Sequence, residues 1–145
     1  MKAHIMNRKA APAAVIIAVS AVVSLLTIIL HKQSVSVCSY DGEDIMSIYE
    51  VNIKIKNGGM LRFCSVYCAE AWFRENSPEA ASVTVTDELT GEKLDASLAI
   101  FVESDVVSVA ATNNRIHVFK DEYQAREHAK QYNGRIVDNP FSLSK

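Results

Sequence analysis

The chain contains 145 residues, of which 49% are hydrophobic and 22% are charged, and its formal net charge is −2. These proportions are typical of a folded globular protein and exclude an intrinsically disordered chain. Acidic residues outnumber basic ones by 17 to 15, so the chain has no excess of positive charge to bind the phosphates of a nucleic acid. We therefore expect no nucleic-acid partner.

An apolar segment without any charged residue, residues 10–30, is the first predicted element. About 20 apolar residues in a helix cross the roughly 30 Å hydrocarbon core of a membrane, so we predict an uncleaved transmembrane anchor here. A cleaved signal peptide is the alternative, but its apolar core would extend over only about 7–15 residues.

Basic residues lie mainly on the N-terminal side of this segment. They occur within residues 1–9, whereas only Lys32 follows the segment closely. The positive-inside rule therefore places residues 1–9 in the cytoplasm. We expect a single-pass cell-membrane protein with a linker at residues 31–37 and an extracytoplasmic domain, on the periplasmic side, at residues 38–145.

Residues 49–76 are predicted to form a strand, a second strand and a helix. Apolar and polar residues alternate over 51–56, a pattern typical of a strand with one buried face. Asn57-Gly58-Gly59 predicts a hairpin turn, because asparagine and glycine tolerate the positive φ that such turns need. The returning strand is predicted at 60–64.

A helix is predicted over residues 66–75, with Ser65 as its N-cap. Its large apolar side chains would bury one face of the helix against a sheet. We interpret Tyr67, Trp72 and Phe73 as core residues for this reason.

The same order of elements is predicted again in residues 105–132. Strands are expected at 106–109 and 116–119, and a helix is expected at 122–132 with Asp121 as its N-cap.

The two predicted units align without a gap, with Ser65 opposite Asp121, which we interpret as an internal duplication. Further strands are predicted between the units at 82–86 and 100–102. The expected fold class is α+β, with an N-terminal transmembrane helix followed by two related strand-strand-helix units whose small antiparallel sheets are each packed by a helix.

The three cysteines of the chain lie close to the first unit, at Cys38, Cys64 and Cys68. Cys64 ends a predicted strand, and Cys68 lies in the first turn of a predicted helix, where free backbone N–H groups stabilise negative charge. We therefore expect thiols of lowered pKa that bind a soft metal ion. The alternatives are a redox pair formed by Cys64 and Cys68, and a structural zinc or interaction module.

Asp41 and Met46 are the candidates for a further ligand. Three thiolates with a thioether such as Met46 or Met60 suit copper(I), whereas three thiolates with Asp41 or a histidine suit zinc. We expect copper(I), with zinc as the alternative. Strand alternation predicts that His117 faces solvent.

The segments Phe63-Cys64-Ser65-Val66-Tyr67-Cys68-Ala69 and Thr90-Gly91-Glu92-Lys93-Leu94-Asp95-Ala96 resemble the accessory proteins of nitrous oxide reductase, the NosL-type copper-binding family. The likeness covers roughly residues 38–138, and the Cys-Ser-x-x-Cys element is also similar to the TRASH-type heavy-metal motif. The resemblance implies a pair of small α+β units that hold copper(I) outside the cytoplasm for delivery to a copper enzyme.

The chain departs from this family at the opening motif. Many members have Cys-x-x-Cys-Gly-Met, where this chain has Cys38-Ser39-Tyr40-Asp41-Gly42-Glu43, so the Asp41 carboxylate replaces a thiolate. No Ser-His-Asp arrangement, HExxH pattern or Gly-rich phosphate loop is present, and we expect no enzyme. The expected function is that of a membrane-anchored metallochaperone or accessory factor, with a client copper enzyme or a membrane transporter as its partner.

Overall fold

The computed structural model describes residues 36–142. The predicted anchor at 10–30 and nearly all of the predicted linker lie outside these residues. Among residues 36–142, no helix is both long and apolar enough to cross a bilayer.

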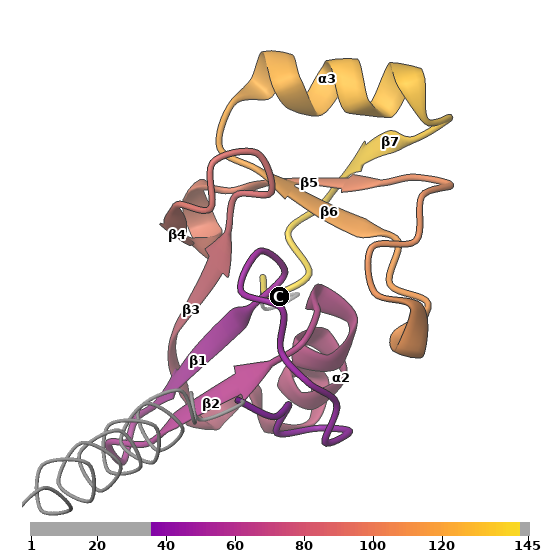
Figure 1. Cartoon of the computed structure of the whole chain (residues 1–145). Helices are drawn as coiled ribbons and strands as arrows, with labels where there is room; N and C mark the ends of the chain where they lie inside the picture. Colours follow the sequence, from indigo (N-terminus) through magenta and orange to yellow (C-terminus); the bar gives the residue numbers. More distant parts are fainter. Residues whose placement is uncertain (1–35, 143–145) are drawn as a thin grey trace, which may run out of the picture. The chain divides into compact units, whose positions relative to one another are not determined.

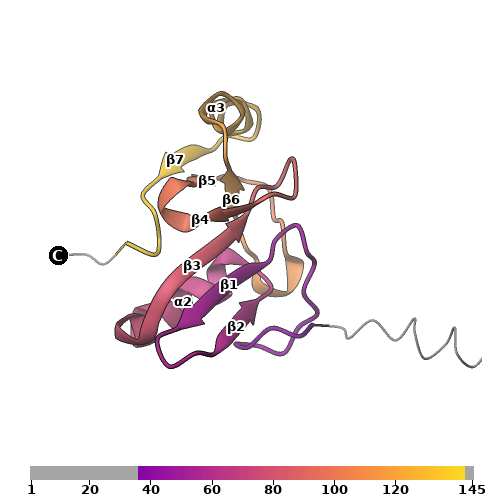
Figure 2. The same ribbon diagram turned by 90° about the vertical axis from the view of Figure 1, so that its left-hand side faces the viewer.

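The described residues form two antiparallel sheets, each packed by one α-helix, with short 3-10 helices in the connections (Figures 1 and 2). In chain order the elements are β1 (Val51–Ile55), β2 (Met60–Phe63), α2 (Val66–Asn76), η1 (Ser77–Glu79), β3 (Ala80–Thr86), β4 (Lys93–Asp95), η2 (Ala96–Leu98), β5 (Ile100–Glu103), η3 (Ala110–Thr112), β6 (Ile116–Phe119), α3 (Glu122–Gln131) and β7 (Arg135–Val137). The predicted α+β class with small antiparallel sheets is confirmed.

The first sheet has the strand order β2-β1-β3-β4. β1 and β2 form the predicted hairpin, in which Val51 pairs with Phe63 and Gly58 supplies the positive φ of 94° that the turn requires. Helix α2 begins where predicted, because the Ser65 side chain accepts a hydrogen bond from the Cys68 backbone N–H. The Phe73 side chain of α2 is buried, whereas Tyr67 is exposed, so its predicted place in the core is wrong.

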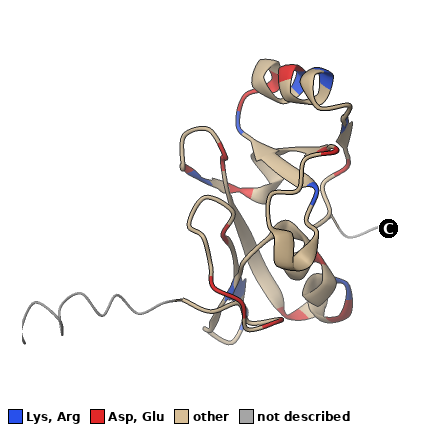
Figure 3. Ribbon diagram, turned by 45° about the vertical axis from the view of Figure 1, so that its right-hand side comes forward, with Lys and Arg blue, Asp and Glu red and all other residues tan. Residues whose placement is uncertain are grey.

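The second sheet has the strand order β6-β5-β7, and α3 lies over it (Figure 1). The Asp121 side chain caps α3 by accepting from the Gln124 backbone N–H, as predicted. At the other end, Asn133 adopts a left-handed φ of 51°. A side-chain carbon on Gly134 would lie 2.5 Å from the Glu103 carbonyl oxygen, so only glycine fits here. The surface of α3 carries acidic and basic residues in turn (Figure 3).

Both sheets repeat one topology. In each, the first strand is central and pairs antiparallel with the next strand and with the strand that follows the helix. The predicted first strand of the second unit at 106–109 is wrong, because β5 takes that place. Phe101 and Val102 of β5 are buried on opposite faces of the sheet, whereas Val107 is exposed. Burial on both faces therefore determines which apolar run becomes the central strand.

His117 is buried in β6, with 2% of its surface exposed, which contradicts the predicted solvent position. Its Nδ1 lies 2.9 Å from Glu88 Oε2, and its Nε2 lies 3.1 Å from the Val106 carbonyl oxygen. The ring also packs against that of His128 on α3, at 4.4 Å between centroids. Alternation failed here because both faces of β6 are covered.

The His117–Glu88 pair predicts a pH-dependent stability. Burial lowers the pKa of His117, but the hydrogen bond and negative charge of Glu88 outweigh burial and raise this pKa above the ordinary value of 6.5. The protonated pair therefore stabilises the fold below pH 6.5, and this contribution is lost as the pH rises through the folded pKa. Burial and the charge of His117 lower the pKa of His128. Protonation of His128 is therefore less favourable in the folded state, so His128 lowers the stability of the fold as the pH falls.

We expect the wild type to exceed a His117→Gln variant in free energy of unfolding by more at pH 5.5 than at pH 8.5. Urea denaturation of both proteins at these two pH values measures the difference directly. An equal difference at both pH values would contradict the role of the protonated pair.

Candidate metal centre

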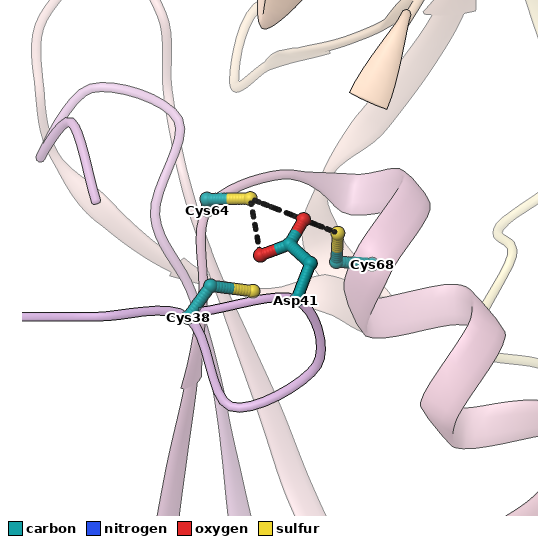
Figure 4. A group of neighbouring side chains, drawn as sticks. All are labelled: Cys38, Asp41, Cys64 and Cys68. Carbon is teal, nitrogen blue, oxygen red and sulfur yellow. Dashed lines mark hydrogen bonds between the residues drawn. The ribbon is translucent and has the colours of Figure 1, made fainter. Parts of the chain in front are cut away.

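Cys38, Asp41, Cys64 and Cys68 lie together beside the first turn of α2 (Figure 4). One donor atom from each of the four side chains lies within 4.8 Å of all the others. The three cysteines are buried and carry free thiols, whereas Asp41 is exposed. We call these four residues the Cys3Asp cluster.

The junction between β2 and α2 positions two of the sulfurs. Cys64 follows the last residue of β2, and the Ser65 cap starts the helix at once, so Cys68 falls within the first helical turn. The cap is held from outside the first unit, because Ser65 Oγ lies 3.3 Å from Thr112 Oγ1. Asn114, which is buried, accepts a hydrogen bond from the Tyr67 backbone N–H at 3.1 Å.

The contacts of Thr112 and Asn114 with the start of α2 were not predicted from the sequence. Asn114 follows the left-handed Asn113, and its side-chain amide donates to the Ile116 carbonyl oxygen at 2.8 Å. The turn before β6 therefore braces the start of α2. The Asn113-Asn114 pair signalled a turn in the sequence, but nothing local to it indicated a contact with α2.

A short loop before β1 positions the other two cluster residues. The Cys38 backbone N–H donates to the Glu43 carbonyl oxygen at 2.8 Å, and Gly42 closes the turn with a φ of 79°. Ser39 attaches this loop to the edge of the first sheet, because its N–H donates to the Arg62 carbonyl oxygen at 2.8 Å. Cys38 and Asp41 are thereby held at the end of β2, beside Cys64.

The donor distances suit a single small ion. Cys64 Sγ and Cys68 Sγ are 3.7 Å apart, far beyond the roughly 2.05 Å of a disulfide bond. Two sulfurs that bind one zinc ion tetrahedrally at about 2.3 Å each would lie about 3.8 Å apart. Asp41 Oδ2 lies 3.0 Å from Cys68 Sγ and 3.6 Å from Cys64 Sγ. The donor set and its spacing therefore fit a thiophilic metal ion.

The pKa values of the Cys64 and Cys68 thiols are raised, contrary to the expected lowering. Burial raises the pKa of Cys64 to about 11. Burial and the neighbouring Asp41 carboxylate raise the pKa of Cys68 as well. Burial alone would raise the pKa of Asp41, but hydrogen bonds from the thiols of Cys68 and Cys38 lower it. In the metal-free protein these two thiols are thus protonated and donate to the carboxylate, and a metal ion must displace these protons to bind.

The two methionines predicted as possible thioether ligands, Met46 and Met60, are exposed. Met46 is 57% exposed and Met60 is 60% exposed, and the carboxylate of Asp41 adjoins the sulfurs in the structure. Ligation by Met46 stays a prediction.

Comparisons with known proteins bear on the fold. No family model and no curated protein matches the sequence. Among solved structures, the chain is similar to the crystal structure of the copper chaperone NosL from Shewanella denitrificans, with a TM-score of 0.64 and 21% sequence identity over 72% of this chain and 87% of that chain. The chain therefore has a NosL-type fold, as the sequence motifs indicated. This neighbour is a copper chaperone rather than an enzyme, in agreement with the expectation of a non-catalytic protein.

Proposed function

We propose that the protein is an extracytoplasmic metallochaperone or accessory factor that carries one copper(I) ion on Cys38, Cys64 and Cys68. The observation that carries this proposal is the convergence of three buried sulfurs from two separate segments of the chain. Copper(I) is a soft ion and prefers thiolate ligands over carboxylate or carbonyl oxygens. The NosL-type fold supports the same function, because a solved protein with this fold is a copper chaperone.

A thiol-redox function is less well supported. Redox-active cysteines are partly exposed and have a lowered pKa, which makes the thiolate available for attack. Here Cys64 and Cys68 are buried, and burial raises the pKa of both thiols.

The proposed cargo is tested by titrating copper(I) into the reduced full-length protein, purified anaerobically in mild detergent, against a chromophoric copper(I) chelator. We expect one copper(I) ion per chain to be withdrawn from the chelator. Protein whose thiols have first been alkylated under denaturing conditions is the negative control. Failure of the native protein to withdraw copper(I) from the chelator would refute the proposal.

A single-pass membrane anchor at 10–30, with the metal-binding domain outside the cytoplasm, forms part of the proposal. The apolar segment and its basic N-terminal flank support it. We expect the intact chain to remain in the membrane fraction after a carbonate wash and its C-terminus to be digested by protease added from outside. Recovery of a soluble product that begins near Val37 would instead indicate a cleaved signal peptide. The expected client is a copper enzyme or a membrane transporter.

A further inference from the structure

We propose that Asp41 determines metal selectivity, by completing a four-coordinate zinc(II) site while adding little to copper(I) binding. The inference rests on the proposed function, since it assumes that the three cysteines bind metal. It predicts that the same cluster accepts two ions through different sets of donors.

The geometry of Asp41 supports direct coordination. Sulfur and oxygen atoms on one tetrahedral zinc ion lie about 3.5 Å apart when their bonds to zinc are about 2.3 and 2.0 Å long. Asp41 Oδ2 lies 3.0 Å from Cys68 Sγ and 3.6 Å from Cys64 Sγ, on both sides of that value. The carboxylate thus lies where a fourth ligand to the three sulfurs would be, as Figure 4 shows.

The orientation of the carboxylate is fixed by its own loop. Asp41 Oδ1 accepts a hydrogen bond from the Glu43 backbone N–H at 3.1 Å, and Oδ2 is the carboxylate oxygen nearer to the sulfurs of Cys64 and Cys68. The Gly42 turn holds the backbone in the conformation that this contact needs. A ligand oriented in this way by a backbone donor loses little conformational freedom on binding a metal.

Zinc(II) and copper(I) differ in how strongly they bind this carboxylate. Zinc(II) takes four ligands in a tetrahedron and readily accepts a carboxylate oxygen beside thiolates. Copper(I) is softer, so the three thiolates supply most of its binding energy and a hard oxygen donor supplies little. Removing the charge and basicity of Asp41 should therefore weaken zinc(II) binding selectively.

The test compares the full-length wild type with Asp41→Asn, Asp41→Cys and the control Asp44→Asn, which alters an exposed carboxylate of the same loop outside the cluster. Zinc(II) and copper(I) affinities are measured separately against chromophoric chelators. We expect Asp41→Asn to lower zinc(II) affinity at least about tenfold, since even outer-shell partners of a metal contribute that much. Copper(I) affinity should change less than about threefold, because a hard carboxylate oxygen contributes little to the binding of a soft ion.

Asp41→Cys should restore zinc(II) affinity by supplying a thiolate, and Asp44→Asn should leave both affinities unchanged. Cobalt(II) serves as a spectroscopic probe, because the ligand-field bands of the tetrahedral ion report its donors and should shift between wild type and Asp41→Asn. Unchanged zinc(II) affinity in Asp41→Asn, or equal losses for both metals, would overturn the inference. Failure of the wild type to bind copper(I) would instead refute the proposed function, so the two failures are distinguishable.

Discussion

Replacement of both Cys64 and Cys68 by serine is expected to lower copper(I) affinity at least about a hundredfold, at the upper end of what loss of an outer-shell partner costs. The two sulfurs lie 3.7 Å apart at a junction that leaves them little freedom, between the end of β2 and the first turn of α2. Serine keeps nearly the same shape but supplies a hard oxygen that copper(I) binds poorly. The measurement is competition with a copper(I) chelator, under the conditions used for the wild type.

A Cys38→Ser variant is the matched comparison for this double variant. Cys38 comes from the loop that also carries Asp41, so the cluster retains two thiolates and a carboxylate when this sulfur is lost. We expect a smaller loss of copper(I) affinity than in the double variant. Unfolding by urea checks that each protein is folded. If the folded double variant bound copper(I) as tightly as the wild type, the cluster would not be the copper(I) site. Its thiols would then have a redox role or a purely structural role.

Local sequence signals predicted the parts of the fold whose causes are local. The Asn57-Gly58-Gly59 turn, the Ser65 cap and the Asp121 cap act within a few residues of themselves, and each was found where expected. The pair of Cys64 and Cys68 was predictable because both residues lie at the start of α2, which the Ser65 cap determines locally. Cys38 was expected beside them because it precedes the predicted hairpin whose returning strand ends at Cys64, and the structure places it there.

Other features depend on contacts between distant segments, which no local pattern encodes. The choice of β5 rather than 106–109 as a central strand follows from burial of Phe101 and Val102 on both faces of the sheet. His117 was misplaced for a similar reason, because α3 and the Glu88 carboxylate cover the face that alternation assigned to solvent.

The thiol pKa values show how a local effect can be outweighed. The start of α2 favours negative charge at Cys68, as the sequence indicated. Burial acts in the opposite direction, and the Asp41 carboxylate adds to it, so the net shift is upward.

Phe141, in the segment after β7, was not predicted as a core residue. Its ring packs edge-on against Phe73 of α2, at 5.6 Å between centroids, and against Phe101 of β5 at 6.0 Å. Asn139 holds this segment in place, because its side-chain amide donates to the Ala96 carbonyl oxygen at 2.8 Å. The Phe141 ring therefore contacts both the helix of the first unit and the central strand of the second.

Phe141→Ala is accordingly expected to lower the free energy of unfolding of the metal-free protein by roughly 3–5 kcal/mol, the usual cost of deleting a buried phenylalanine ring. The wild-type ring is 8% exposed and contacts the rings of Phe73 and Phe101, so its removal deletes a largely buried apolar contact. Leu98→Ala is the control: Leu98 is 75% exposed, and its truncation should change stability by less than about 0.5 kcal/mol. Urea denaturation of the metal-free proteins measures both values, because bound metal would stabilise the folded state by mass action and mask the loss. Equal stabilities of the two variants would show that the segment after β7 does not hold the two sheets together.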